Sequence, residues 1–476
     1  MTGLKKRFPA WAGSPRLAAA WLALLLCAAA LRVVAAWNDF WLDEIWSVAL
    51  AREVSSPLDV FTLHHENNHY LNTLWLLVLH GANYPLLCRL PSLLAAICSV
   101  AVAGAIGWRR NSAAGFCCAV LVAFSYVFTL VSTEARGYSS AILCALFCYW
   151  MLEIYFAGPS RRVAAAYAAS AILGLASHPF FVSFYLAAMV WTLYRGTHRG
   201  QSARERMVPF IELHGIPLAV LAVFYVIDLH DLEIGGGTDA DSITGRYCDA
   251  ATWMLAVPWA GRAVPSALAL GVLALGVWQL RREASRSFVF FPAVIVFPLV
   301  FSLLRGSTVV YVRHFAIAIT FWLLLAGFVA AELYQRGGWA RRASVVSILC
   351  YLAANSWYLV ELSQFGRGQY SKALEFIAQH TTSPVVRVAG DHDTRVGQTL
   401  IFHVTENAHG KRWHYSGTER WPKEGVEWAI LHKESFDDPS PPFPEATDDW
   451  GNQYAFVRGF PSAPLSGLHW FLYHRR

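Results

Sequence analysis

Long apolar runs alternate with short polar connections over most of the first 360 residues of the sequence. A helix that crosses a membrane needs about 20 consecutive, mostly apolar residues, and many of these runs are close to that length. The pattern therefore predicts an all-α polytopic membrane protein. We expect eleven spans, at residues 17–37, 91–107, 113–132, 138–156, 163–178, 180–194, 208–227, 264–280, 287–304, 314–334 and 343–361.

The basic residues of the connections indicate how the chain crosses the membrane. Short loops rich in Lys and Arg mark the cytoplasmic side. With eleven spans, the N-terminus shares one side with all of the basic clusters, which lie at 5–16, 109–110, 161–162, 195–206, 281–286 and 336–342. The N-terminus is then cytoplasmic, and three long segments lie on the outer face, at 38–90, 228–263 and 362–476.

The segment 68–82 is apolar but has only 15 residues. A segment of that length is more typical of an interfacial or re-entrant helix than of a span. Counting it as a span would reverse every later loop and break the agreement of the basic clusters. We therefore expect a helix that lies on the outer membrane surface, within the loop 38–90.

The tail 362–476 is polar and rich in proline, unlike the rest of the chain. It contains an expected helix over Tyr370–His380 and short β-like runs at 385–389, 427–432, 454–457 and 470–473. A segment of roughly 110 residues is long enough for its own core. We predict two domains, a membrane domain over 1–361 and a small C-terminal α/β domain over 362–476 outside the cytoplasm.

The composition agrees with a membrane protein. Hydrophobic residues make up 56% and charged residues 15% of the chain, against roughly 45–50% and 25% in soluble proteins. The mean hydropathy is +0.39 and the net charge +6. These values exclude a disordered chain, a nucleic-acid-binding protein and an ordinary cytosolic enzyme. Among the nine cysteines, Cys88 and Cys248 fall in polar connections, so a bridge between them is one open possibility.

Two adjacent carboxylates, Asp43 and Glu44, follow the first expected span and are flanked by large apolar residues. One interpretation is a solvated pair that caps a juxtamembrane helix. The other is a general base in an apolar surround, where its pKa is tuned. Neighbouring side chains on a helix point in different directions, so one carboxylate would react while the other orients it.

The same loop continues with a polar stretch over 64–72 that is dense in hydrogen-bonding side chains. Its candidate substrate-binding residues are His65, Glu66, Asn68, His69 and Asn72. Histidine and glutamate are also metal ligands, but the stretch contains no spacing typical of a metal site. We therefore expect contacts with a sugar or a phosphate, no metal and no cofactor; a merely polar loop is the alternative.

Ionisable residues at membrane depth are costly, so they usually mark a site. Arg136 and Tyr138 lie at the outer end of the third expected span, and Arg313 lies at the outer start of the tenth, near Arg305. Arginine suits phosphate because its planar fork binds two oxygens. His178, at the outer end of the fifth span, is a further candidate for substrate binding. The alternative for each arginine is snorkelling to the interface.

All of these candidates are predicted at the outer membrane surface, which favours a single cavity. A carboxylate beside arginines at a lipid boundary indicates an amphiphilic substrate that carries a phosphate.

The chain resembles the GT-C superfamily of glycosyltransferases that use polyprenyl-phosphate sugars. It is most similar to the group of protein O-mannosyltransferases and lipid A aminoarabinose or galacturonic acid transferases. Five motifs carry the resemblance, and their order along the chain also fits: Trp41-Leu42-Asp43-Glu44, Arg89-Leu90-Pro91-Ser92, Glu134-Ala135-Arg136-Gly137-Tyr138, Ser177-His178-Pro179-Phe180 and Tyr311-Val312-Arg313-His314-Phe315.

The resemblance implies a membrane glycosyltransferase with Asp43 as the catalytic base, Glu44 in support and arginines on the donor phosphate. Its partners would be a polyprenyl-phosphate-linked sugar, membrane lipids and a lipid, glycan or protein acceptor, at the periplasmic face of the plasma (inner) membrane in the cell envelope. Retention usually needs a second carboxylate as nucleophile, and the sequence contains no clear one, so inversion is expected.

Three other classes remain open at this stage. A transporter or flippase of a lipid-linked sugar would also have many spans and arginines, although polar residues near mid-bilayer are then expected, and these spans contain few. The others are a transferase that uses a diphosphate donor and a non-catalytic scaffold that acts through the outer tail. Loss of transfer on mutation of Asp43 separates an enzyme from a scaffold.

Overall fold

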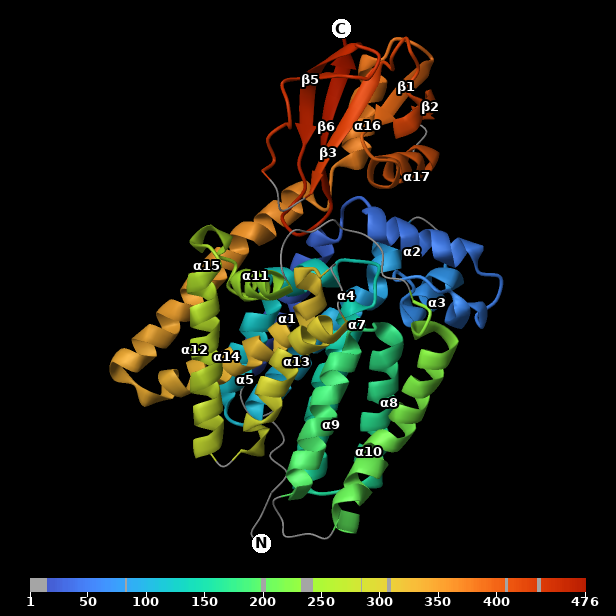
Figure 1. Ribbon diagram of the computed structural model, residues 1–476. Helices are drawn as coiled ribbons and strands as arrows, with labels where there is room; N and C mark the ends of the chain where they lie inside the picture. Colours follow the sequence, from blue (N-terminus) through green and yellow to red (C-terminus); the bar gives the residue numbers. More distant parts are fainter. Residues whose placement is uncertain are drawn as a thin grey trace.

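The computed structural model describes residues 15–81, 84–197, 203–232, 243–283, 285–305, 310–406, 410–434 and 438–476. The chain forms a large helical part and a smaller domain with a sheet, which sits at one end of the helices (Figure 1). Asp39 and Phe40, which precede Asp43 in the first loop, form hydrogen bonds with the smaller domain.

Every expected span coincides with helical structure. The helices are α1 (Pro15–Ala35), α4 (Pro85–Trp108), α5 (Ser112–Ala123), α6 (Tyr126–Ser132), α7 (Tyr138–Ala157), α8 (Arg161–Ser177), α9 (Phe181–Thr197), α10 (Ala203–Phe224), α12 (Ala263–Arg282), α13 (Phe290–Arg305), α14 (Ala316–Arg336) and α15 (Gly338–Phe365). The third expected span is divided into α5 and α6, which are bent by 60°. Ser125 begins the second piece, because its hydroxyl accepts a hydrogen bond from the N–H of Phe128.

Seven helices are long and apolar enough to cross a membrane among the described residues, or eight if the bent pair is one span. Helices α8 and α9 have 17 residues each, and α13 is a shorter apolar helix. The fold is that of a polytopic helical membrane protein, and the count of eleven crossings stays a prediction.

The long connections 38–90 and 228–263 contain short helices. Helix α2 (Leu42–Glu53) follows α1, and the expected interfacial helix is α3 (Tyr70–Val78). At nine residues, α3 is too short to span a bilayer. The segment 228–263 contains α11 (Ile243–Leu255); its residues 233–242 lie outside the described part of the chain.

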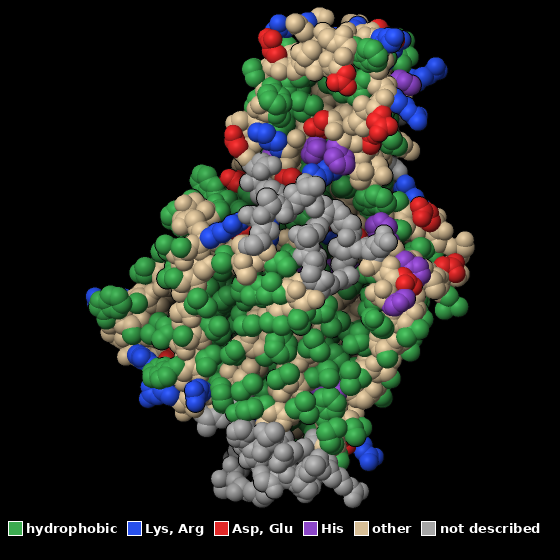
Figure 2. Space-filling model, in the orientation of Figure 1, with side chains coloured by type: hydrophobic (Ala, Val, Ile, Leu, Met, Phe, Trp, Pro, Cys, Tyr) green, Lys and Arg blue, Asp and Glu red, His purple; other side chains and the backbone are tan. Residues whose placement is uncertain are grey.

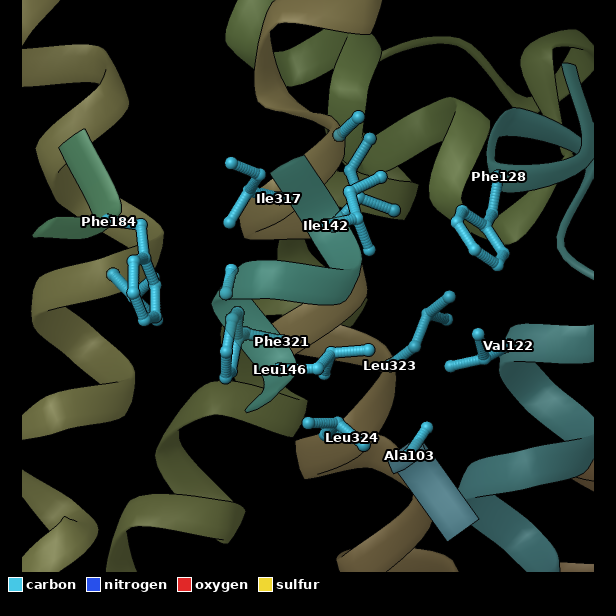
Figure 3. Close-up of a cluster of buried hydrophobic side chains, with 14 of the residues drawn as sticks. Ala103, Val122, Phe128, Ile142, Leu146, Phe184, Ile317, Phe321, Leu323 and Leu324 are labelled. Atoms are coloured by element: carbon cyan, nitrogen blue, oxygen red, sulfur yellow. The ribbon is translucent and has the colours of Figure 1, made fainter. Parts of the chain in front are cut away.

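The core of the helical part surrounds α14, whose side chains are buried on almost every side. A helix that is apolar all round belongs in the centre of a bundle. Figure 3 shows Ile142 and Leu146 of α7 close to Ile317, Phe321 and Leu324 of α14.

Cys88 and Cys248 lie on helices α4 and α11 rather than in the polar connections where they were expected. All nine cysteines fall in described ranges and are free thiols.

The C-terminal domain is a mixed six-stranded sheet in the order β2-β1-β3-β6-β5-β4. Its elements are α16 (Tyr370–His380), β1 (Val385–Gly390), α17 (Thr399–Glu406), β2 (Arg412–Ser416), β3 (Trp428–Glu434), β4 (Glu445–Thr447), β5 (Gln453–Phe460) and β6 (Leu468–Arg475). Strands β2, β1 and β3 are parallel, whereas β3, β6, β5 and β4 pair antiparallel. The α/β prediction is confirmed, with the expected helix and four of the strands in place.

The two parts are joined by hydrogen bonds close to the start of α2. Asp39 accepts bonds from the N–H and the hydroxyl of Ser371, at 2.7 and 2.8 Å. The ring Nε2 of His403 on α17 lies 2.9 Å from the carbonyl oxygen of Phe40. The C-terminal domain therefore rests directly on the segment that leads into the candidate carboxylates.

Candidate active site

Helix α2 begins at the residues that carry the two carboxylates. Trp41 has an extended backbone and is the N-cap, and its N–H donates to the Glu44 carboxylate at 3.5 Å. Carboxylates in a first turn are favoured by the positive end of the helix dipole. Successive residues of a helix point in different directions, so Asp43 faces a cavity while Glu44 is fully buried.

Asp43 is held between two arginines that are distant in sequence. Its Oδ2 lies 2.6 Å from Nη1 of Arg136 and 3.0 Å from Nη2 of Arg313. The Arg313 guanidinium also lies over the rings of Trp41 and Tyr311, with 4.9 and 4.4 Å to the ring centroids. The expected meeting of this carboxylate with these arginines is therefore present in the structure.

Glu44 forms a buried ion pair instead of facing the cavity. Its oxygens accept from Nε and Nη2 of Arg89 at 2.8 and 2.7 Å, and from the N–H of Ala135 at 2.7 Å. Arg89 also donates to the carbonyls of Ala36, Asn38 and Asp39. The side chain of Glu44 thus ties α2 to α4 and to the loop that carries Arg136.

The loop 133–137, between α6 and α7, is fixed from several sides. The side-chain amide of Asn72 donates to the backbone carbonyl of Ala135 at 2.6 Å. The hydroxyl of Ser92 donates to the backbone carbonyl of Arg136 at 2.8 Å. A Cβ on Gly137 would lie 1.7 Å from the carbonyl oxygen of Ser177, so only glycine fits this approach. Arg136 is therefore rigidly placed.

Histidine rings pack behind the arginines. His69 and His178 are stacked with their centroids 4.6 Å apart, and the ring of Tyr138 lies 4.1 Å from that of His178. Nδ1 of His69 accepts from the N–H of Gly137, and Nδ1 of His178 accepts from that of Phe180. A neutral ring whose Nδ1 accepts carries its proton on Nε2, so both tautomers are fixed.

Burial lowers the pKa of His69 well below 6.5, and the nearby His178 and Arg136 act in the same direction. The pKa of His65, at the cavity wall, is also lowered, chiefly by burial. Burial raises the pKa of Glu134, against the opposing charge of Arg367. These shifts favour the neutral rings of His65 and His69, so the positive charge beside Asp43 comes from Arg136 and Arg313.

A cavity of about 1370 Å³ opens at Asp43, larger than the roughly 300–1,000 Å³ typical of drug-sized ligands. One part of its wall is apolar and comes from α6, α10 and α13, for example Val131, Leu221 and Phe301. The polar wall comes from the first loop, the arginines and the C-terminal domain, and includes His64, His65, Glu66, Asn67, Arg136, Tyr138, His178, Arg313, His314, His392, Thr394, Arg395 and Glu434.

Four other predicted residues lie around the cavity rather than in its wall: Glu44, Asn68, His69 and Asn72. The amide of Asn68 donates to the carbonyls of Val60 and Leu63, at 2.7 and 3.0 Å, so this side chain shapes the loop. Asn72 and Glu44 likewise bind backbone groups and do not line the cavity. Arg305 ends α13, and its side chain lies outside the described part of the chain.

Several residues that structure the site were not foreseen. Asn67 accepts from Nη2 of Arg136 at 2.7 Å. Arg367 is fully buried and pairs with Glu134 at 2.7 Å, and also donates to the carbonyl of Leu130. The signal for Arg367 was its place directly after the last span, where a charged residue at the membrane boundary needs a partner. In the part of the chain that the structure describes, no three His, Cys, Asp or Glu side chains form a group that could hold a metal ion.

This arrangement of apolar helices, short helices after α1 and a C-terminal sheet domain is shared with proteins of known structure. It is similar to crystal structures of ArnT from Cupriavidus metallidurans, a lipid A aminoarabinose transferase. The apo structure aligns with a TM-score of 0.52 and the structure bound to undecaprenyl phosphate with 0.54. In both alignments 12% of residues are identical, and 96% of this chain and 98% of that chain are covered. No model of a protein family and no curated protein sequence matches the chain.

Proposed function

We propose that the protein is a membrane glycosyltransferase that moves a sugar from a polyprenyl-phosphate donor to a hydroxyl acceptor on the outer face of the plasma (inner) membrane. Asp43 is the general base. The observation that carries this proposal is the carboxylate between Arg136 and Arg313, at the wall of a large cavity that is apolar on one side and polar on the other.

A polyprenyl-phosphate donor suits both walls of the cavity. Its lipid chain fits the apolar wall of α6, α10 and α13. Its phosphate suits the guanidinium groups of Arg136 and Arg313, which bind two oxygens at once. The similar fold of ArnT, which has been crystallised with undecaprenyl phosphate, supports a donor of this class. We assign sugar contacts to His65, Glu66 and His178 in the polar wall.

The reaction needs one base and a stabilised leaving group. Both arginines contact Oδ2 of Asp43, which leaves Oδ1 to accept the proton of the acceptor hydroxyl. The acceptor oxygen then bonds to the anomeric carbon while the bond from that carbon to the phosphate oxygen breaks, and its electron pair leaves with the phosphate. The arginines stabilise the charge that develops there.

Inversion is supported by the environment of the nearby carboxylates. Glu44 and Glu134 are buried in ion pairs with Arg89 and Arg367, so Asp43 is the carboxylate placed between the cavity arginines. A single base is sufficient for direct displacement, whereas retention needs a carboxylate nucleophile as well.

The orientation follows from the basic loops, which place the N-terminus in the cytoplasm. The cavity and the C-terminal domain then face the periplasm, where a lipid, glycan or protein acceptor meets the donor. No cofactor enters the reaction as proposed.

Purified protein in detergent and lipid, given a panel of radiolabelled polyprenyl-phosphate sugars and an envelope extract of the source cell, tests this proposal. We expect label to move from one donor to an acceptor. No turnover of any donor, together with protein-dependent movement of the intact lipid across a vesicle bilayer, would instead establish a flippase.

A further inference from the structure

The C-terminal domain forms part of the cavity that contains Asp43. Leu465, Ser466 and Leu468 line the cavity near the start of β6, and four further polar side chains complete this wall, His392, Thr394, Arg395 and Glu434. In Figure 2, histidine and charged side chains gather where this domain meets the helical part. The first loop supplies the facing polar wall, so a molecule that reaches Asp43 from outside the membrane passes between the two.

These four residues belong to the carboxyl ends of two adjacent parallel strands. Strands β1 and β3 pair in parallel, with Gly390 opposite Ile430. His392, Thr394 and Arg395 follow the end of β1, and Glu434 ends β3. In sheets with parallel strands, ligands bind at the carboxyl ends, because the loops there diverge and leave a crevice.

The turn after β1 is held in one conformation. It is a π-helical turn over Asp393–Gln398, a form that is frequent at functional sites. The ring of His392 caps it by accepting from the N–H of Arg395. Asp393 accepts from the hydroxyl of Tyr415 and from both the N–H and the hydroxyl of Thr418. Thr394 and Arg395 therefore line the cavity from a turn that is already ordered before any ligand binds.

Arg395 is paired but remains partly open. Its Nη1 lies 2.5 Å from Oε1 of Glu434 and 3.4 Å from Nε2 of His432, and the two paired side chains are 26% and 25% exposed. The ring Nδ1 of His432 lies 2.7 Å from Oδ1 of Asp391, and the backbone N–H of His432 donates to Oδ2 of the same carboxylate. Donors and acceptors thus alternate within a small area.

The charges of this cluster point to a neutral ligand. Arg395 is balanced by Glu434, and Asp391 adds a negative charge. An anion would meet two carboxylates here, whereas the cavity arginines already provide a phosphate site. Sugar hydroxyls, which donate and accept at once, match a paired arginine and glutamate beside a threonine and a histidine.

We propose that His392, Thr394, Arg395 and Glu434 form an acceptor subsite that binds a neutral carbohydrate group and brings its hydroxyl to Asp43. This proposal rests on the transfer reaction proposed above. The acceptor is then a glycan or glycolipid rather than an unmodified protein or a phospholipid.

The test uses the polyprenyl-phosphate sugar that the donor panel shows to be active. Transfer from this donor to the glycolipid fraction of the source cell's membranes is measured while the concentrations of acceptor and donor are varied separately. Arg395→Met removes the charged hydrogen-bond donor of the subsite. Thr394→Val removes one hydroxyl and keeps the ion pair between Arg395 and Glu434. Arg412→Met, on the exposed part of β2, is the matched control. Melting curves in detergent report the folding of each variant.

We expect Arg395→Met to raise the acceptor KM by about tenfold or more, the size of a lost charged hydrogen bond. Thr394→Val should raise it by a few fold, and the donor KM and the control should stay within about twofold of the wild type. If both variants have the same acceptor KM as the wild type, or if the label enters protein or phospholipid, the proposal of an acceptor subsite is overturned. No transfer by the wild type would instead overturn the reaction itself.

Discussion

Glu44→Gln is the substitution that perturbs the framework of the site most directly. Glu44 is 0% exposed and accepts three short hydrogen bonds, two from Arg89 and one from the N–H of Ala135. Glutamine has the same size, but its NH₂ group must face a donor, and the Arg89 charge is left buried without a counter-charge. Breaking a buried ion pair from one side costs about 3–5 kcal/mol.

We therefore expect Glu44→Gln to lower the free energy of unfolding by about 3–5 kcal/mol, measured by denaturant titration in mixed micelles. Transfer should fall as well, because Ala135 precedes Arg136 in the loop that Glu44 holds. Glu53→Gln, at the exposed end of the same helix, is the control and should be near neutral.

A double variant separates charge from shape. Glu44→Leu with Arg89→Met removes both charges, and buried pairs replaced by apolar residues are often tolerated. We expect the double variant to recover only part of the lost stability, since the carbonyls of Ala36, Asn38 and Asp39 lose the hydrogen bonds that Arg89 donates. If Glu44→Gln is as stable as Glu53→Gln, the buried ion pair does not hold the site and the reasoning is wrong.

Two further predictions concern the arginines and the histidines. Arg136→Lys and Arg313→Lys keep the charge but lose the planar fork, so each should raise the donor KM by roughly 10- to 100-fold while the acceptor KM changes little; an unchanged donor KM in both would place the phosphate elsewhere. Because burial holds the pKa of His69 well below 6.5, the folded protein keeps this ring neutral while the unfolded chain takes up a proton below about pH 6.5. Its contribution to stability is therefore full above that pH and falls by up to about 1.4 kcal/mol per unit below it. Melting curves from about pH 7.5 to 5.5 measure the slope, which His69→Asn should reduce, and an identical slope in the variant would contradict the assignment.

The apolar helices could be predicted because hydropathy is a local property of the sequence. Each expected span coincides with a helix, and the expected helix at Tyr370–His380 begins and ends as predicted. Strands β2 and β4 and helix α17 were missed, since all three are short and their sequences are partly polar. Their positions depend on packing against β1, β5 and α16, which no local pattern contains.

The site was only partly predictable, for a related reason. The chemistry of Asp43, Arg136 and Arg313 is visible in the sequence because charges beside apolar runs are costly. Their pairing across the chain, and the choice between Asp43 and Glu44 as the residue that faces the cavity, depend on how α2 packs. Arg395 and Glu434 resemble ordinary surface residues of a polar tail. Only the docking of the C-terminal domain places them at the cavity.

Donor binding and sugar transfer, measured on the same preparation of Asp43→Asn, test the central claim most directly. Asp59→Asn, which changes an exposed carboxylate in the same loop, is the matched control. Loss of a general base should reduce transfer by about 100- to 10,000-fold. Donor affinity should be retained or increased, because Arg136 and Arg313 lose a competing carboxylate. Transfer within about tenfold of the wild type would contradict the assignment of Asp43 as the base.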